Sequence, residues 1–222
     1  MDVEKYGRKI EQYRQEELQF RKDLHSLFSG DKKLASKPLV IGKTGNALSV
    51  CGADAGLPLT ITKKVIEKCI RPEIRDENGK LVGKTGHGLT IDNVIASIDS
   101  LKIPIFIFKG THENSLLVVT DVKEKRSRNI VVAISLNEKE GFEKVNRIRS
   151  AYGRDNIENY IEKNMRNGNL IAINIKKAND MFHSIEKWYL KENPHISFDN
   201  TIAYTTENVK YPEKIKEKGD LR

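Results

Sequence analysis

The first 28 residues repeat apolar side chains at steps of three and four, a spacing that predicts one long amphipathic helix. Glu17 interrupts this stripe, and Ser29-Gly30-Asp31 ends the helix. The members of the stripe are Val3, Tyr6, Ile10, Tyr13, Phe20, Leu24 and Leu27. Three placements are open for such a helix: on the protein core, against a second copy, or as the stub of a larger polypeptide.

From Lys37 the pattern changes to short apolar runs separated by polar stretches, which is typical of strands. The runs are Pro38–Ile41, Leu57–Ile61, Ile103–Phe108, Leu116–Thr120, Ile130–Leu136, Val145–Tyr152 and Leu170–Ile175. The last five follow one another with short links or a single helix between them. We therefore expect these five to form the core of an antiparallel sheet.

Helices are indicated beside these runs. A helical turn passes through Val65, Ile66 and Cys69, and Thr90 and Asp155 are suited to cap two further helices, the second closed at Asn167-Gly168. The apolar faces comprise Ile91, Val94, Ile95, Ile98 and Leu101 after Thr90; Ile157, Ile161 and Met165 after Asp155; and Ala178, Met181, Phe182, Ile185, Trp188 and Tyr189 in a last helix.

Together these elements predict the α+β class: helices packed on a four- to five-stranded antiparallel sheet, with a long amino-terminal helix. The 222 residues suffice for one good core. We divide the chain into a charged helix at residues 1–35, which serves as a linker or packing arm, a folded domain at 36–190, and a polar tail at 191–222 that we expect to be mobile.

The net charge of +8 is concentrated in the middle of the chain. Residues 1–35 and 191–222 are nearly balanced, whereas residues 36–190 hold 25 Lys and Arg against 18 Asp and Glu. A basic excess confined to the folded part indicates a polyanionic partner, with nucleic acid first. Ordinary lysine-rich composition explains the charge equally well.

Several classes of protein are excluded. No apolar run approaches the roughly 20 residues of a membrane span, and the acidic, amphipathic amino terminus is no signal peptide. Cys51 and Cys69 have neither metal-ligand spacing nor a disulfide framework, and the five histidines are scattered. We therefore expect no metal, no cofactor and a reducing, cytoplasmic site of action.

The stretch Gly83-Lys84-Thr85-Gly86-His87-Gly88 contains the Gly-Lys-Thr of a phosphate-binding loop. Such a loop needs a glycine six residues before its lysine, where this chain has Asn78, and the earlier Gly-Lys-Thr at 42–44 has Lys37 there. The spacing therefore disfavours a nucleotide loop. His87 is the better candidate, because imidazole exchanges a proton near neutral pH and its flanking glycines admit a ligand. A surface histidine before a helix is the simpler alternative.

The segment 145–154 carries a second candidate site. Strand alternation places Asn146, Ile148, Ser150 and Tyr152 on one face, so Ser150 and Tyr152 project together at the strand end. Gly153-Arg154 then leads into a helix start, where backbone N–H groups favour an anion. A hydroxyl, a phenol and a guanidinium at this point suit a phosphate; a packed tyrosine at a strand end is an equal alternative.

With these residues in view, the chain resembles a known family. The resemblance rests on the order of His87-Gly88-Leu89, the strand at Pro104, Asn146 to Arg154, Gly168-Asn169-Leu170 with Asn174, and Lys176-Lys177-Ala178. It covers about residues 38–182. The chain is similar to the toxin domain at the carboxy terminus of phage MuF-type head proteins and related polymorphic toxins, a group with the barnase–EndoU–colicin–RelE-like nuclease fold.

The resemblance implies metal-independent RNA cleavage on the open face of a four-stranded sheet. It assigns catalysis to His87, Ser150, Tyr152 and Arg154. Substrate contacts would come from Lys68, Lys84, Thr111, Arg149 and Lys176, with Thr111 standing where relatives commonly have a serine. The residue types suit attack by the ribose 2′-hydroxyl, which needs a base, an acid and cations for the developing charge.

The partners expected on this basis are RNA, either tRNA or mRNA, and an acidic immunity protein. The basic residues should line the open sheet face around Arg149, Arg154 and Lys176. Delivery as part of a phage or secretion-system protein, and an oligomer formed through the amino-terminal helix, are further expectations. Two alternatives are a non-catalytic phage head-associated or RNA-binding module of the same fold, and an ADP-ribosyltransferase toxin. Glu158 and Glu162 disfavour the last, because they belong to a helix.

Overall fold

The computed structural model describes residues 3–28, 37–80, 82, 86–182 and 202–204, with the backbone alone for residues 3–10, 13, 28 and 202–204. The helices are α1 (Val3–Phe28), α3 (Asn46–Ser49), α4 (Lys63–Ile70), α5 (Ile91–Ser100), α6 (Ile157–Arg166) and α7 (Ile175–Phe182). The strands are β1 (Leu39–Lys43), β2 (Pro58–Ile61), β3 (Phe106–Lys109), β4 (Ser115–Lys123), β5 (Asn129–Glu140), β6 (Glu143–Gly153), β7 (Leu170–Asn174) and β8 (Ile202–Tyr204).

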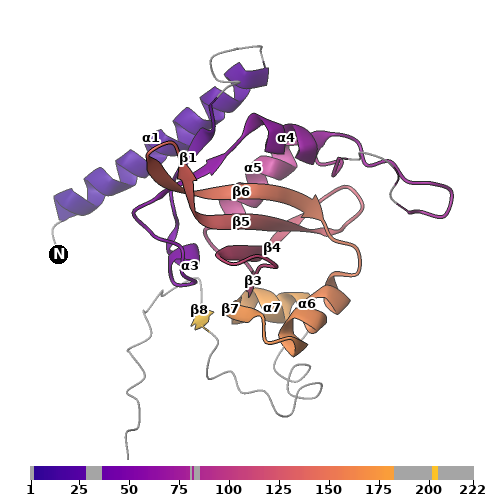
Figure 1. Ribbon diagram of the computed structural model, residues 1–222. Coiled ribbons are helices and arrows are strands. Elements are labelled where there is room, and N and C mark those ends of the chain that lie inside the picture. Colours follow the sequence, from indigo (N-terminus) through magenta and orange to yellow (C-terminus); the bar gives the residue numbers. More distant parts are fainter. Residues whose placement is uncertain (1–2, 29–36, 81, 83–85, 183–201, 205–222) are drawn as a thin grey trace, which may run out of the picture.

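All the described strands belong to one mixed sheet in the order β1-β2-β6-β5-β4-β3-β7-β8 (Figure 1). The α+β class is confirmed, but the expected four to five antiparallel strands are too few. The antiparallel core β6-β5-β4-β3-β7 matches the five predicted core runs. Two parallel pairings were missed, β2 with β6 and β7 with β8, because each joins strands that are distant in the sequence.

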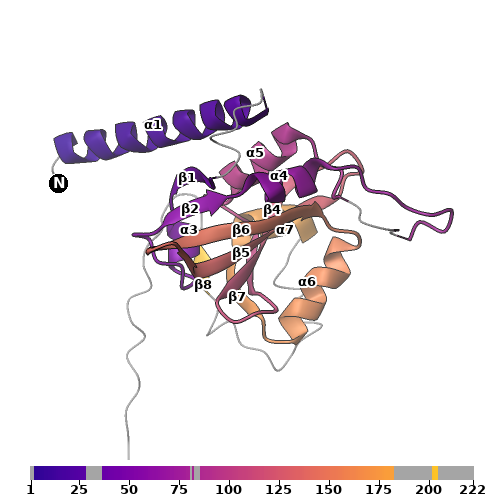
Figure 2. The same cartoon turned by 45° about the horizontal axis from the view of Figure 1, so that its top comes forward.

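The sheet is covered by helices on both faces (Figures 1 and 2). One core cluster packs α1, α3, α4 and α5 against side chains such as Ile107, Val132 and Ile148. A second cluster packs α6 and α7 against Phe106, Phe108 and neighbouring residues of β4, β5 and β7. Alternate residues of each central strand therefore enter opposite cores, which is why β3, β4 and β5 each contain a continuous apolar run, at 106–108, 116–119 and 130–134.

The long amino-terminal helix lies against the folded domain at its carboxyl-terminal half. Phe20, Leu24 and Leu27 are buried in the larger core, and the helix contacts β1. The amino-terminal end of α1 lies away from the sheet in both views (Figures 1 and 2). The structure describes only the backbone of the other predicted members of the apolar stripe, which are Val3, Tyr6, Ile10 and Tyr13.

Two helix starts compare differently with the sequence. Thr90 caps α5 as predicted. Its hydroxyl accepts a hydrogen bond from the N–H of Asn93, and the side-chain oxygen of Asn93 accepts one from the N–H of Thr90, so the two residues form a capping box. For α6 the predicted cap Asp155 is wrong, because Asn156 is the cap and takes a left-handed φ of 49°. The Asp155 carboxylate instead pairs with Arg75 and Arg128, whose charges attract it more strongly than a helix end.

The tail also departs from expectation. Ile202–Tyr204, within the predicted mobile tail, forms β8 beside β7. The predicted continuation of the last helix through Ile185, Trp188 and Tyr189 lies outside the described residues. Over the residues that the structure covers, no helix is long and apolar enough to cross a membrane.

Candidate functional site

The candidate site lies at the carboxyl end of β6, beyond the point where β2 stops pairing with this strand. Strand β2 pairs with β6 only as far as Ile148, and a bulge follows, since Ala133 of β5 faces Ser150 while Ile134 faces Ile148. The extra residue is Arg149. Ile148 therefore turns into the larger core, whereas strict alternation placed it on the face of Ser150 and Tyr152. The predicted joint projection of Ser150 and Tyr152 is unaffected, because both follow the bulge.

Helix α4 and the segment after it occupy the edge of β6 that β2 leaves free. The N–H of Ala151 donates to Cys69 Sγ at 3.3 Å. The N–H groups of His87 and Leu89 then donate to the carbonyls of Lys68 and Cys69. These bonds return the chain to the end of α4, so that His87 lies beside the carboxyl end of β6.

His87 contacts both side chains that the sequence placed at this strand end. Its Nε2 lies 2.9 Å from Ser150 Oγ, and its ring centroid lies 5.6 Å from that of Tyr152. Ser150 is buried, and His87 and Tyr152 are half-buried. Residues separated by 63 positions thus form one group of a base, a hydroxyl and a phenol.

The surroundings keep the imidazole of His87 neutral at physiological pH. Burial and, to a smaller extent, the nearby positive charges of Lys68 and Arg128 lower the pKa of His87 to about 4, although Glu73 opposes the shift. Burial likewise raises the pKa of the Tyr152 phenol, against the opposing charge of Arg154. The pair therefore combines a proton acceptor with a protonated hydrogen-bond donor.

Arg154 supplies an uncompensated positive charge beside the two phenols. Its guanidinium carbon lies 4.5 Å from the ring centroid of Tyr160, in cation–π geometry. No acidic side chain among the described residues forms a salt bridge with Arg154. Burial raises the pKa of Tyr160, and the adjacent hydroxyl of Tyr152 acts in the same direction. Both phenols are therefore protonated donors at neutral pH.

A network of charged side chains forms the opposite rim. Glu73 accepts from Arg75, Arg126 and Arg128, and its side chain is only 10% exposed. Arg128 also pairs with Glu124 at 2.9 Å, and Arg75 pairs with Asp155 at 2.8 Å. The network joins the segment that precedes His87 to the β4–β5 turn and to the start of α6.

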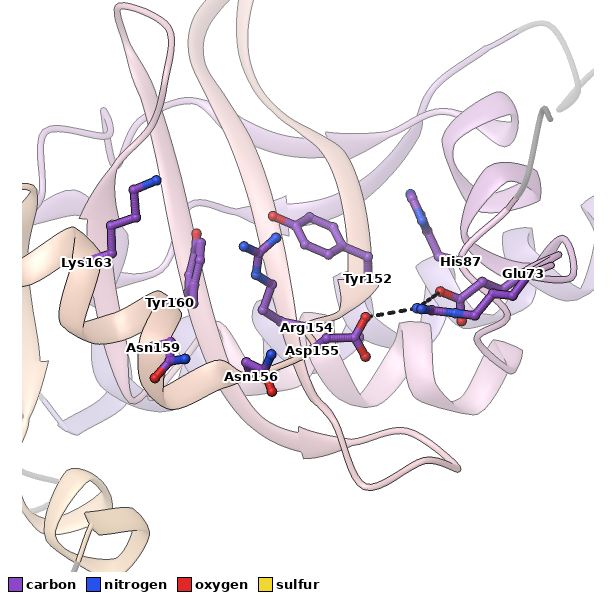
Figure 3. Close-up of a pocket in the computed structure, with 11 residues that line it drawn as sticks. Glu73, His87, Tyr152, Arg154, Asp155, Asn156, Asn159, Tyr160 and Lys163 are labelled. Atoms are coloured by element: carbon purple, nitrogen blue, oxygen red, sulfur yellow. Dashed lines mark hydrogen bonds and ion pairs between the residues drawn. The ribbon is translucent and has the colours of Figure 1, made fainter. Parts of the chain in front are cut away.

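These elements enclose a cavity of about 540 Å³. Figure 3 shows His87 and Glu73 on one side, Tyr152 and Arg154 in the middle, and Tyr160 and Lys163 of α6 on the far side. The cavity is lined by Glu73, Arg75, His87, Tyr152, Gly153, Arg154, Asp155, Asn156, Asn159, Tyr160 and Lys163. The lining is thus polar, with aromatic rings between the positive charges.

The sequence-predicted catalytic residues come together here, but the predicted substrate contacts mostly do not. His87, Tyr152 and Arg154 line the cavity. Ser150 is hydrogen-bonded to His87, and the positive charge of Lys68 lowers the pKa of His87. Lys84 lies outside the described residues.

The remaining three predicted contacts lie elsewhere on the surface. Thr111 is exposed in the β3–β4 turn, at the sheet end opposite Tyr152. Arg149 pairs with Glu138 at 3.5 Å. Lys176 is exposed on α7, and β5, β4 and β3 lie between β7 and β6.

The implied open sheet face is present only in part. Helices α6 and α7 cover β3, β7 and the neighbouring ends of β4 and β5. Ala133 and Ser135 of β5 and Arg147 of β6 remain half-buried on this side. Of the basic residues expected to line the face, Arg154 alone lines the cavity, because Arg149 and Lys176 lie at the positions just described.

The residues of α6 were missed, although the sequence carries a signal for them. Asn156, Asn159, Tyr160 and Lys163 recur at helical spacing and form one polar stripe beside the apolar face that packs on the sheet. Glu73 and Arg75 carry no comparable signal, since the contacts that tie them to Arg126, Arg128 and Asp155 span more than 50 positions.

Comparisons with known proteins add one finding. No curated protein and no solved structure matches the chain. One family model matches a segment of the chain that begins after α4 and ends within α7. Lys68 and Glu73 lie before this segment, as do α1, β1, β2 and α4, whereas His87, the end of β6 and the whole of α6 lie within it. The segment comprises residues 82–180, and the model that it matches is described as the Phage MuF-C-terminal domain.

Proposed function

We propose that this protein is a metal-independent endoribonuclease toxin that cleaves RNA by attack of the ribose 2′-hydroxyl. One observation carries the proposal: a neutral histidine, bonded to Ser150, lies in a polar cavity beside an arginine that has no acidic partner in the described chain. This chemistry needs a base, proton donors and a fixed positive charge.

His87 is the proposed base, because a neutral imidazole can accept the 2′-hydroxyl proton without first losing one of its own. In the tautomer whose Nε2 carries the ring proton, Nε2 donates a hydrogen bond to Ser150 Oγ and Nδ1 is left as the proton acceptor. Nδ1 has no hydrogen-bond partner among the described residues. Ser150 would therefore act by orienting the ring of His87.

The proposed step balances in bonds and protons. The 2′-hydroxyl gives its proton to His87, the 2′-oxygen forms a bond to phosphorus, and the bond from phosphorus to the 5′-oxygen breaks. The leaving 5′-oxygen takes up a proton, for which the Tyr152 phenol, which lines the cavity beside His87, is the proposed donor. Products are a 2′,3′-cyclic phosphate and a 5′-hydroxyl end. Arg154 offsets the negative charge that develops on the phosphoryl oxygens.

RNA, either tRNA or mRNA, is the proposed substrate, and an acidic immunity protein is the proposed inhibitor. The support is the basic excess of residues 36–190 and the unpaired charges of Arg154 and Lys163 at the cavity. The match to a phage MuF carboxy-terminal domain fits delivery with a phage particle.

The two alternatives differ from this proposal in what they require. A non-catalytic module of the same fold does not need His87 bonded to Ser150 or the cavity beside them, so activity measurements separate it from the nuclease. An ADP-ribosyltransferase needs a glutamate at its active centre. Glu158 and Glu162 lie on α6 but do not line the cavity, and the carboxylate of Glu73, which does line it, is engaged by Arg75, Arg126 and Arg128.

Incubation of the purified protein with total RNA in the presence of chelator tests the proposal. Cleavage with 5′-hydroxyl products is expected, and His87→Ala and Tyr152→Phe should each reduce the rate about a hundredfold or more. His112→Ala is the matched control, since His112 is exposed in the β3–β4 turn and should keep full activity. Full activity in both site variants would contradict the assignment.

A further inference from the structure

The wall of the cavity formed by α6 has no task in the cleavage step itself. Asn156, Asn159, Tyr160 and Lys163 line this wall, and Lys163 lies at the end away from His87 (Figure 3). Tyr160 and Lys163 are three positions apart on the helix, so both lie on the side that faces the cavity. The wall therefore offers polar groups beyond the reacting centre.

Most of these polar groups lack partners within the described part of the protein. The Tyr160 hydroxyl faces that of Tyr152, which carries a hydroxyl of its own into the cavity. Lys163 forms no salt bridge, and the side-chain amides of Asn156 and Asn159 form no hydrogen bond, among the residues that the structure covers. A cation and two amides without partners at a cavity are available to a ligand.

The charge pattern of the wall favours an anionic ligand group. Arg154 covers the ring of Tyr160, and Lys163 follows on the other side, so one aromatic ring separates two positive charges. The first turn of α6 contributes backbone N–H groups that also favour an anion. A phosphate at Lys163 would complement a scissile phosphate at Arg154.

The size of the cavity suits a nucleotide placed between the two phosphates. Its volume of about 540 Å³ lies within the usual range for small-molecule sites and exceeds what one phosphate requires. The free amides of Asn156 and Asn159 are donors and acceptors of the kind that bind sugar and base edges.

We propose that the α6 wall binds the nucleotide next to the scissile phosphate and holds that nucleotide's second phosphate at Lys163. The inference rests on the proposed ribonuclease function and names its substrate more closely. The enzyme acts best inside an RNA chain, where every nucleotide carries a phosphate on each side, and poorly on a bare dinucleotide.

Three synthetic substrates test the inference: a dinucleoside monophosphate, the same molecule with a 5′-terminal phosphate, and the same molecule with a 3′-terminal phosphate. One of the two phosphorylated forms should give a kcat/KM about tenfold higher than the unmodified form, the effect of one charge-assisted contact. Lys163→Met should reduce this ratio to about one.

The matched control is Lys176→Met, which removes the same charge from an exposed helix position outside the cavity and should retain the tenfold ratio. Because the readout is a ratio within one variant, a general loss of activity does not imitate the effect. Equal rates on all three substrates, or equal loss in both variants, would overturn the subsite while leaving the nuclease assignment standing.

A second measurement keeps the subsite testable if no RNA is cleaved. Calorimetry with a nucleoside 3′,5′-bisphosphate and the matching monophosphates measures binding without a reaction. Tighter binding of the bisphosphate to the unmodified protein, lost in Lys163→Met and kept in Lys176→Met, supports the subsite. Equal affinity for both classes of nucleotide overturns it.

Discussion

The carboxylate of Glu73 and the guanidinium of Arg128 lie 2.9 Å apart, although 55 residues separate them and both side chains are about nine-tenths buried. The pair joins the segment that precedes His87 to the β4–β5 turn. The contact therefore holds the segment before His87 against the start of β5, which pairs with the end of β6.

Replacing Glu73 by Gln should destabilise the protein by about 3 kcal/mol, because Arg128 would be left buried with one carboxylate partner fewer. Chemical denaturation measures the free energy of unfolding. Glu67→Gln is the matched control: among the described residues Glu67 pairs with Lys63 alone, at 3.8 Å on the surface of α4, and its loss should cost less than about 1 kcal/mol. Equal effects of the two substitutions would contradict a structural role for the network.

The same contact sets a pH dependence. Burial alone would raise the pKa of Glu73, but hydrogen bonds and charges from Arg128 and Arg75 outweigh burial and hold that pKa below its usual value. This stabilisation is present above the pKa of an unfolded glutamate and is lost as the pH falls through the folded value. The acid-side loss of stability should therefore be smaller in Glu73→Gln.

Much of this site was predictable from the sequence, and the unpredicted part has a common physical cause. His87, Ser150, Tyr152 and Arg154 carry local signals, namely a histidine between glycines and a polar strand end before a helix. Glu73 depends on contacts across the fold and has no periodicity that marks it. Ion pairs between such distant residues can be identified only when the three-dimensional fold is known.

The sheet gives a parallel case. The five core strands are short, apolar and bounded by turns, so the sequence predicts them. The bulge at Arg149 was missed, although the sequence carries a trace of it, because the buried apolar residues Val145, Ile148 and Ala151 recur at every third position and not at every second. The single extra residue moved Ile148 to the opposite face.

The pH–rate profile should show the unusually low pKa of His87. A base must be unprotonated in the free enzyme, so kcat/KM should stay level from neutral pH down to about pH 5 and fall only as the pH approaches the pKa of His87, about 4. An ordinary histidine would give a fall near its usual pKa of 6.5. A profile that declines around pH 6.5 would contradict the assignment of a buried, neutral His87.

Lys68 should shift this profile. Its positive charge lowers the pKa of His87, so Lys68→Gln should raise that pKa and move the acid limb toward neutral pH. Titration of the His87 ring by nuclear magnetic resonance measures the change directly. Lys64→Gln, at an exposed position of the same helix, is the control and should leave the His87 pKa in place.

The cap of α5 should contribute to stability rather than to chemistry. Thr90→Ala removes the acceptor for the N–H of Asn93 and should cost about 1 kcal/mol of unfolding free energy, measured by denaturation. Thr111→Ala is the control, since Thr111 is exposed and its hydroxyl has no described hydrogen-bond partner. Loss of RNA cleavage in Thr111→Ala would show that substrate reaches the far end of the sheet.

Salt dependence should separate the charges of the cavity from those elsewhere on the surface. Each phosphate contact releases counterions, so the logarithm of the RNA-binding constant falls linearly with the logarithm of salt concentration, by roughly one unit of slope per contact. Arg154→Ala and Lys163→Met each remove a cavity charge and should each lower the slope by about one. Lys176→Met and Arg149→Ala should leave the slope nearly unchanged, because Lys176 lies on α7 and Arg149 already pairs with Glu138.

The measurement is a filter-binding or fluorescence titration across a salt series, with single-stranded RNA and an inactive His87→Ala background to prevent cleavage. An equal change of slope for all four substitutions would mean that RNA binds the whole basic surface. The cavity would then not be the site that binds the RNA phosphates.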